Sequence, residues 1–345
     1  MASRRNRRVL LVRRPVGVPQ DGDFRLDEVE VPELGEGQAL VRNLYLMLDP
    51  AIRGWMNESK GSYMPPIALG SPVRSGNLSQ VIESRIPGIE PGQLHSTLAG
   101  WEEYSVLDTH GFHGRMQPEP GIPLHSLPNV FGGSGLTAYF GLFEIGRPKE
   151  GETVVVSAAS GSVGSLVGQL AKIAGARAVG LTSDAAKAKW LVEELGFDAA
   201  IDYRHEDLRE ALKRTCPKGV DVYFDSVGGE ILDTVLGRIN VGARVVLCGA
   251  ISQINATEAP VGPRNYMQLL AKRACMQGFV TIDFAKRYPE ARQRIAAFIR
   301  EGKLRYRDEV IDGLDNAPRH FLRLFDGSHR GKLMVRLADP EGSST

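Results

Sequence analysis

Several features that mark whole classes of protein are scarce or missing in this chain of 345 residues. Lysine and arginine number 42 and aspartate and glutamate 41, so no charge excess is available to bind nucleic acid or an acidic membrane surface. No apolar run approaches the roughly 18 residues of a membrane span. The short apolar stretch at residues 9–12 runs directly into Arg13, Arg14 and Pro15, which does not match a secretory leader.

Cysteine is also rare. Cys216, Cys248 and Cys275 lie far apart and form neither a CxxC pair nor a Cys/His spacing that would hold a metal. We therefore expect a cytoplasmic protein with no metal site, no nucleic-acid partner and no membrane partner. The one basic run, residues 4–8, is interpreted as a solvated N-terminal tail.

The pattern of the remaining residues changes along the chain. Residues 9–12, 24–31 and 39–46 resemble strands separated by Pro, Gly and Asp turns, whereas strand-like and helix-like segments alternate from about residue 128. Such alternation predicts a doubly wound parallel sheet in an α/β fold. We expect a β-rich domain at 1–127 and 309–345 and a nucleotide-binding Rossmann domain at 128–308, with the strand near residue 335 returning to the first domain.

The stretch at residues 153–182 carries the clearest functional signal. A β-branched run is followed by Ala159-x-Gly161-x-x-Gly164, then by a segment with helical spacing and a second strand. This βαβ context makes a dinucleotide fingerprint credible. Gly161 would admit a pyrophosphate close to the backbone, and Gly164 would allow close packing of the helix. A glycine-rich turn without a cofactor is the competing interpretation.

The chain resembles the zinc-free branch of the medium-chain dehydrogenase/reductase superfamily, which includes prostaglandin reductases, alkenal double-bond reductases and curcumin reductases. The resemblance covers nearly the whole chain. It is carried by an ordered set of motifs at residues 43–50, 53–54, 100–104, 157–164, 194–198, 223–230, 248–252, 276–279 and 331–332. It implies a GroES-like first domain, a homodimer and NADPH-dependent reduction of the C=C bond of α,β-unsaturated ketones and aldehydes. Independently, residues 45–70 contain no Cys or His that could bind a catalytic zinc.

The choice of cofactor depends on the end of the second strand. Asp184 would suit the ribose 2′-hydroxyl of NAD, whereas Lys187, with Lys189 as an alternative, would suit the 2′-phosphate of NADP. The resemblance favours Lys187 and NADP(H), and it places Tyr203 near the same phosphate. The residues expected to bind the cofactor are Gly161, Ser162, Val163, Gly164, Ser183, Lys187, Tyr203, Ser226, Cys248, Gly249, Ala250, Ile251, Ser252, Phe279, Val280, Thr281 and His329.

The substrate side departs from the family pattern. Ile254 stands where the family usually has the tyrosine that stabilises the enolate oxygen, and Ala51 replaces a second tyrosine. Ser226 and His329 replace two asparagines, and Ser79 replaces a glycine. Since isoleucine has no proton to donate, three interpretations stay open: an enone or alkenal reductase with a reshaped pocket, a quinone reductase, or an NADPH-binding protein with little catalysis.

Other groups would have to line the pocket or donate the hydrogen bond. The nicotinamide ribose hydroxyl, water or another tyrosine could serve the enolate oxygen; Tyr63, Tyr45 and Tyr266 are the candidate tyrosines, and Tyr63 is the predicted catalytic one. The expected pocket residues are Tyr45, Ala51, Trp101, Ile254 and Tyr266. Each tyrosine has an alternative role in packing. For the homodimer, residues 234–247 with the segment that follows are expected to supply the sheet edge at which two copies pair.

Overall fold

The computed structural model describes residues 4–58 and 62–341. It divides into two compact units, one of residues 1–129 with 308–345 and the other of residues 130–307. The predicted boundaries at 127/128 and 308/309 lie close to these divisions. The helix α2 (Leu127–Val130) spans the first point at which the chain passes from one unit to the other.

The second unit is built on a six-stranded parallel sheet in the order β10-β9-β8-β11-β12-β13. Its strands are β8 (Thr153–Val156), β9 (Arg177–Thr182), β10 (Ala199–Asp202), β11 (Val220–Asp225), β12 (Ile239–Leu247) and β13 (Cys275–Gly278). The strands add outward in one direction from β8 and in the other from β11. Ligands of doubly wound sheets bind at the switch point between two such strands. The predicted Rossmann sheet is confirmed.

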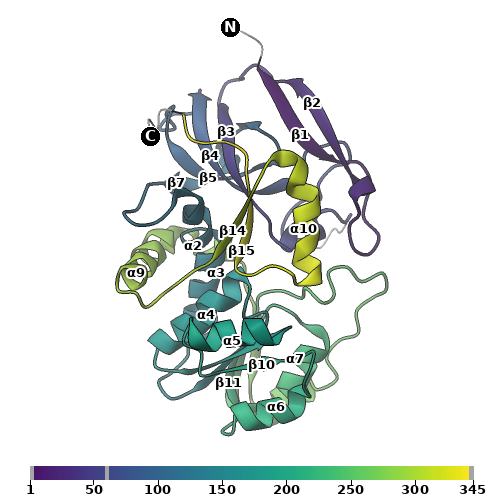
Figure 1. Ribbon diagram of the computed structural model, residues 1–345, viewed down its shortest axis with the longest axis vertical. Helices are drawn as coiled ribbons and strands as arrows, with labels where there is room; N and C mark the ends of the chain where they lie inside the picture. Colours follow the sequence, from purple (N-terminus) through teal and green to yellow (C-terminus); the bar gives the residue numbers. More distant parts are fainter. Residues whose placement is uncertain (1–3, 59–61, 342–345) are drawn as a thin grey trace. The chain divides into compact units, whose positions relative to one another are not determined.

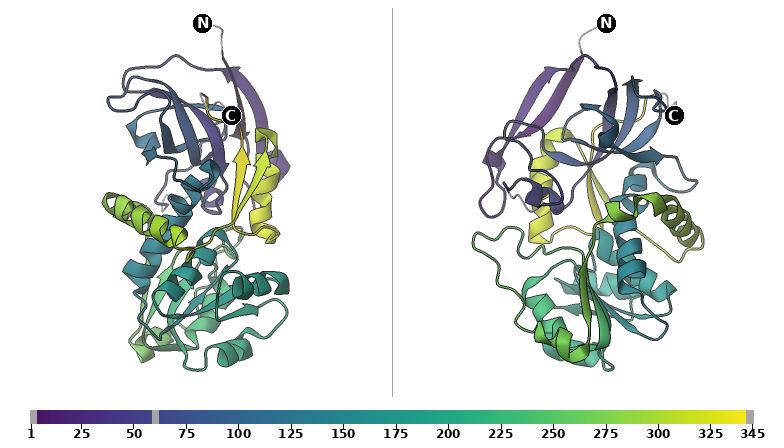
Figure 2. Two further views of the ribbon diagram at one scale, coloured as in Figure 1. Left: turned by 60° about the vertical axis from the view of Figure 1, so that its left-hand side comes forward. Right: turned by 180° about the vertical axis from the view of Figure 1, so that it is seen from behind.

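Helices cover both faces of this sheet, as Figures 1 and 2 show. Side chains of α6 (Leu208–Thr215) and α7 (Gly229–Leu236) share one buried cluster with Val155, Val179 and Tyr223 of the strands. The opposite face carries α4 (Ser162–Ile173) and α5 (Ala185–Glu193). There a Cβ on Gly168 would lie 1.9 Å from the ring of Phe197, so α4 can approach only because residue 168 is glycine.

Three further helices complete the second unit: α3 (Gly133–Phe140), α8 (Met267–Lys272) and α9 (Tyr288–Arg300). The chain between α3 and β8 forms a π-helical segment at Gly141–Gly146. Of the stretch expected to supply a sheet edge, residues 234–247 with the segment that follows, β12 itself is not an edge, because it is paired on both sides, with β11 and with β13. The edge strand is β13, which follows it.

The first unit contains a seven-stranded, mostly antiparallel sheet in the order β14-β15-β3-β4-β5-β7, with β6 paired to β3. Its strands are β3 (Ala39–Met47), β4 (Arg74–Ser84), β5 (Leu94–Gly100), β6 (Tyr104–Leu107), β7 (Phe112–Met116), β14 (Asp308–Asp312) and β15 (Lys332–Arg336). As predicted, the last strand returns to this unit, where Met334 of β15 lies opposite Met47 of β3. The separate β-rich domain is therefore confirmed.

Two helices and a ribbon surround this sheet. The short helix α1 (Ala51–Trp55) and the longer α10 (Ala317–Asp326) contribute Ile52 and Phe321 to the apolar core of the first unit. The ribbon consists of β1 (Arg5–Leu11) and β2 (Phe24–Glu30), which pair antiparallel from end to end.

The interpretation of residues 4–8 as a solvated tail is wrong for most of this run. Arg5, Arg7 and Arg8 lie in β1 and form ion pairs with Glu28, Asp315 and Asp27, respectively. Asp27 and Glu28 lie on the facing strand β2, which pairs with β1 through seven Cα partners, whereas Asp315 lies in the short turn Leu314–Asn316 before α10. Because these three arginines are paired with carboxylates, they do not form an unpaired basic patch.

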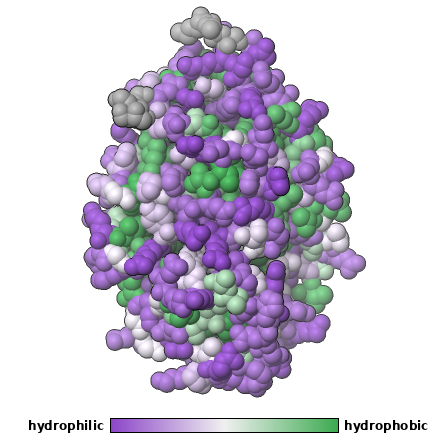
Figure 3. All heavy atoms as spheres, viewed as in Figure 1, coloured by the Kyte–Doolittle hydropathy of each residue, from purple (hydrophilic) through white to green (hydrophobic). Residues whose placement is uncertain are grey.

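Figure 3 shows a face covered mainly by hydrophilic residues, with the apolar ones gathered in separate small patches. Among the residues that the structure describes, no helix combines the length and the apolar character needed to cross a membrane.

The carboxylate of Asp225 ties the central strands of the second unit together. It is fully buried at the end of β11 and accepts hydrogen bonds from the Ser157 and Tyr223 hydroxyls, at 3.0 and 2.8 Å. The backbone N–H groups of Val227 and Gly228 donate to the same side chain, each at 3.0 Å. Four donors around one buried charge fix the chain after β8 relative to the turn after β11.

We expect the substitution Asp225→Asn to lower the free energy of unfolding by about 2–4 kcal/mol, because an amide turns a donor toward groups that also donate. Asp207→Asn is the matched control, since Asp207 is an exposed N-cap that accepts one bond from the Glu210 N–H and asparagine caps helices equally well. Urea unfolding followed by circular dichroism measures both. Equal losses in the two variants would contradict the role given to Asp225.

Candidate functional site

The turn after β8 has the geometry of a phosphate-binding loop. Ala158 adopts a left-handed conformation with φ of 47°, and its carbonyl accepts a bond from the Gly161 N–H at 2.9 Å. Gly161 is the N-cap of α4 and supplies no side-chain cap, so the first N–H groups of the helix, at Ser162, Val163 and Gly164, have no capping side chain. Such groups attract phosphate, aided by the helix dipole.

Gly164 is required for the shape of this loop. A Cβ at this position would lie 2.4 Å from the Ala158 carbonyl oxygen and 2.8 Å from the Ala159 Cα. The close contact is therefore between the first turn of α4 and the loop itself. Any larger residue would push the helix away from the loop and misalign its N–H groups.

The end of β9 brings together the residues expected to choose between cofactors. Lys187 has a side chain that is only 5% exposed, and its Nζ lies 3.5 Å from the Ser183 hydroxyl and 3.4 Å from the Asp184 carboxylate. The other oxygen of Asp184 accepts from the Lys187 N–H at 2.8 Å and caps α5. Tyr203 donates its backbone N–H to Thr182 at the end of the same strand, and burial raises the pKa of its phenol. Lys189, by contrast, is 71% exposed.

The segment after β12 is held by the turn after β11. The N–H groups of Cys248 and Gly249 donate to the Asp225 carbonyl, and those of Ile251 and Ser252 donate to Ser226 and Val227. Burial raises the pKa of the Cys248 thiol to about 11, which disfavours its thiolate form near pH 7. The sequence-predicted residues 248–252 thus lie together at the carboxyl end of the sheet, with Ala250 exposed to solvent.

Phe279, Val280 and Thr281 follow the edge strand β13. The ring of Phe279 packs edge-on to Phe224 at 6.5 Å, and a Cβ on Gly141 would collide with both rings. Ile254 is half-buried in the turn that begins at Ile251, where it presents no group that could donate a proton. Tyr266, expected in the pocket, is 57% exposed beside the start of α8.

The first unit holds the remaining predicted residues, and one prediction fails there. Trp101 has no exposed surface and lies in the apolar core, stacked on Phe24 and edge-on to Phe321. It cannot line a pocket, because core packing covers it on all sides. Tyr45 is 7% exposed, and burial raises the pKa of its phenol. Tyr63 is 62% exposed, and Ala51 is the first residue of α1.

One buried polar group of the first unit, Lys332, was not predicted as a site residue, whereas the predicted His329 lies close to it in the chain and is half-buried. Lys332, 3% exposed, forms an ion pair with Asp49, which joins β15 to the chain just before α1. His329 lies three residues earlier, with its Nδ1 3.0 Å from the Arg323 carbonyl. The sequence offered Lys332 only as part of a motif, and its partner lies 283 residues away in the chain.

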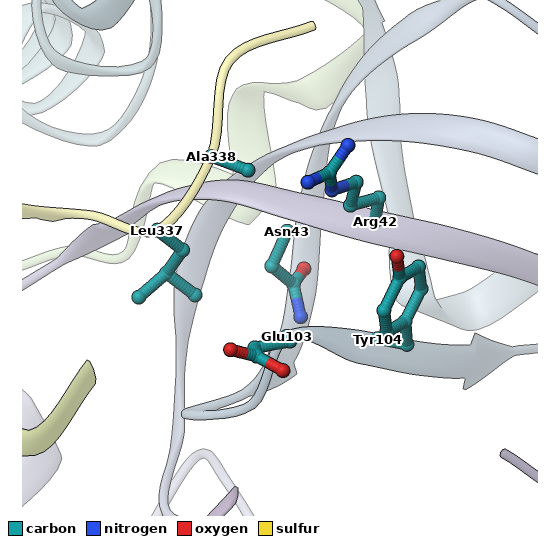
Figure 4. Close-up of a pocket in the computed structure, with 6 residues that line it drawn as sticks. All are labelled: Arg42, Asn43, Glu103, Tyr104, Leu337 and Ala338. Carbon is teal, nitrogen blue, oxygen red and sulfur yellow. The ribbon is translucent and has the colours of Figure 1, made fainter. Parts of the chain in front are cut away.

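One small cavity of about 100 Å³ lies in the first unit beside β3. Figure 4 shows it lined by Arg42, Asn43, Glu103, Tyr104, Leu337 and Ala338. Arg42 pairs with Glu341 and Glu103 with Arg7, so its charged groups already have partners. Its volume suits a few water molecules rather than an organic substrate.

Across residues 4–58 and 62–341, no group of three or more His, Cys, Asp or Glu side chains is arranged to hold a metal ion. The three cysteines are all free thiols.

Each half of the chain contains a match to a known protein family. Residues 7–114 match the N-terminal domain of oxidoreductase, and residues 162–297 match the zinc-binding dehydrogenase family. The second name describes the family as a whole, and the described residues of this chain carry no zinc-binding cluster.

Individual relatives match over nearly their whole length. The NADPH-dependent curcumin reductase of Escherichia coli is 42% identical over 97% of each chain, and the NADP-dependent 2-alkenal reductase of Nicotiana tabacum is 39% identical over 96% of this chain and 98% of its own. The crystal structure of CurA from Vibrio vulnificus in complex with NADPH is 39% identical, with a TM-score of 0.90, and covers 97% of this chain and 100% of its own. The chain therefore belongs to the zinc-free branch of the medium-chain dehydrogenase/reductase superfamily.

Proposed function

We propose that this protein is an NADPH-dependent reductase of the C=C bond of α,β-unsaturated ketones and aldehydes, with an atypical substrate pocket. The observation that carries the proposal is the combination of a complete dinucleotide loop with full-length similarity to curcumin, 2-alkenal and prostaglandin reductases. The free cysteines and the absence of a membrane-crossing helix among the described residues are compatible with a cytoplasmic location.

The second unit fits NADP(H) at its own residues. The uncapped start of α4 offers N–H groups to the pyrophosphate, and the buried ammonium of Lys187, next to Ser183, offers a cation to the 2′-phosphate. Asp184 is occupied in capping α5 and pairing with Lys187, which argues against the competing role at the 2′-hydroxyl of NAD. With NADPH held by these residues, the site would have a source of hydride for the β-carbon of an enone.

The protein must also stabilise the negative charge that develops on the enone oxygen. Ile254 cannot do so, and removal of one such donor commonly lowers the rate by about 10²–10³-fold. Tyr63 is our proposed substitute, since its ring is exposed on the loop that follows α1. A phenol hydroxyl can donate a hydrogen bond to such an oxygen.

Two other functions differ in what they require. A quinone accepts hydride with less need for a donor, so a quinone reductase would tolerate Ile254. A protein that binds NADPH with little catalysis would tolerate it as well. Both keep the same cofactor residues, so only turnover separates them from enone reduction.

We expect the protein to oxidise NADPH in the presence of 1-octen-3-one or 4-hydroxynonenal. Loss of NADPH absorbance measures the rate, and a small quinone is tested as acceptor in parallel. The variant Ile254→Tyr should raise kcat for the enone by up to about 100-fold, because it restores a donor, and should affect the quinone far less. Ile254→Phe is the matched control, since it adds the ring without the hydroxyl. Quinone turnover without enone turnover would favour the quinone reductase. An unchanged enone kcat in Ile254→Tyr would show that residue 254 does not face the reacting oxygen.

For the cofactor, we expect Lys187→Ala to raise the Kd of NADPH about 10- to 100-fold, while that of NADH changes less than about threefold, since only NADPH carries the 2′-phosphate. Quenching of protein fluorescence reports both constants. Lys189→Ala, which removes an exposed lysine two residues away, is the control. An equal loss of affinity for NADPH and NADH in Lys187→Ala would contradict a 2′-phosphate site at Lys187. A loss of NADPH affinity that appears only in Lys189→Ala would place the site at Lys189 instead.

We also propose that two copies pair along β13, the edge strand of the parallel sheet. Its outward residues Cys275 and Gln277 are exposed, and none of the residues of the neighbouring α8 is buried. Large apolar side chains lie uncovered beside it, with Leu270 70% exposed and Met267 52% exposed. An unpaired edge flanked by apolar groups is a surface that association would cover.

Accordingly, Leu270→Glu should raise the dimer dissociation constant at least about tenfold, because dimer formation would bury the new charge. Sedimentation equilibrium measures the constant. Val192→Glu places the same charge on an exposed apolar position of α5, away from β13, and should leave it as in the parent protein. A parent protein that sediments as a monomer, or equal effects of the two variants, would refute pairing at this edge.

A further inference from the structure

Arg74, the first residue of β4, is a half-buried cation without an acidic partner. Among the described residues it forms no ion pair, and the only hydrogen bond of its side chain runs from Nη2 to the Pro65 carbonyl. Its Nε is buried and has no acceptor, and its guanidinium carbon lies 5.5 Å from the centre of the Trp55 ring. Burial lowers the pKa of this guanidinium, and no nearby carboxylate offsets the effect.

The neighbouring arginines show that this state is unusual. Arg53 is almost fully buried, yet it donates to the carbonyls of Pro15 and Gly17 and to Asn57. Arg14 donates to the carbonyls of Met56 and Ile67 and pairs with Glu58 at 3.4 Å. Both are satisfied by the protein, whereas Arg74 keeps Nη1 without a hydrogen bond and not buried. A half-buried cation of this kind keeps one arm available to an anion from outside the chain.

The surroundings of Arg74 connect it to the substrate side. Trp55 and Ala51 are four residues apart on α1, so their side chains share one face of the helix. Ala51 stands where the family has a phenol. Pro65, which accepts from Arg74, is two residues beyond Tyr63 on the loop that follows α1. The Nε1 of Trp55 is a second buried donor without an acceptor at the same place.

We propose that Arg74, supported by the Trp55 ring, binds a carboxylate carried by the substrate, so that the preferred enones are acidic ones. This inference rests on the proposed reductase function and specifies its substrate class. A carboxylate would take a charge-assisted hydrogen bond from the free Nη1 arm. The ring of Trp55 would keep the guanidinium in place before the substrate arrives, since stacking on an aromatic face favours a fixed plane.

The test compares straight-chain methyl enones that end in a carboxylate with their methyl esters, in a series of chain lengths. The wild type should prefer the acid at the length that spans the pocket. In Arg74→Gln, kcat/KM for that acid should fall about 10- to 100-fold relative to the ester, mainly through KM, and Arg74→Lys should recover part of the loss. Arg14→Gln is the matched control: it also releases the loop from an arginine, but that arginine is already paired, so the ratio of acid to ester should stay as in the wild type.

The proposal would be overturned if the ratio of kcat/KM for the acid to kcat/KM for its ester were the same in the wild type and in Arg74→Gln. So would a loss of NADPH affinity in Arg74→Gln, because Arg74 would then serve the cofactor. If the wild type reduces no enone at all, the proposed reductase function fails on its own. Calorimetric titration of the NADPH-loaded protein with the saturated acid and its ester still decides the site: binding of the acid that is lost in Arg74→Gln supports it, and equal binding of acid and ester refutes it.

Discussion

The nucleotide-binding unit depends on one buried charge. Placing a carboxylate such as that of Asp225 out of contact with water is costly unless donors surround it. Here Ser157 comes from the chain after β8, Tyr223 from β11 itself, and Val227 and Gly228 from the turn beyond. The Asp225 carbonyl in turn holds the N–H groups of Cys248 and Gly249. Three segments that meet at the switch point of the sheet are therefore positioned by a single residue.

The fold of the second unit could be predicted from the sequence. Its determinants are local: β-branched strands, a glycine turn whose Gly164 tolerates no Cβ, and a helix cap at Asp184, all within about 30 residues. Their order along the chain dictates the order of the strands. The role of Asp225 was not predicted, because one of its donors, Ser157, is remote in the sequence. Hydrophobic periodicity gives no signal for a contact of this kind.

The first unit could be predicted only in outline. Its β-rich character and the return of the last strand follow from composition and pattern, but the pairing of β5 and β7 and the helix α10 did not. Trp101 shows the reason. A large aromatic residue after a glycine fits a pocket wall and a core equally well, and only the distant rings of Phe24 and Phe321 decide for the core. The ion pair between Lys332 and Asp49 is equally remote in sequence.

The same distance in sequence hides the chemistry of the substrate side. Ile254 and Ala51, considered by themselves, replace the two phenols of the family, and a site without these donors is expected to be a poor catalyst. The arrangement of Arg74, Trp55 and Pro65 describes a gain at the same helix and loop. A half-buried guanidinium that the protein leaves without an acid reduces stability, whereas Arg53 nearby shows that the fold can satisfy such a group fully. Departures of this kind from complete satisfaction are expected where a ligand completes the structure. Under the proposed function, the exchange of phenols for an unpaired cation corresponds to a changed substrate rather than to a decayed enzyme.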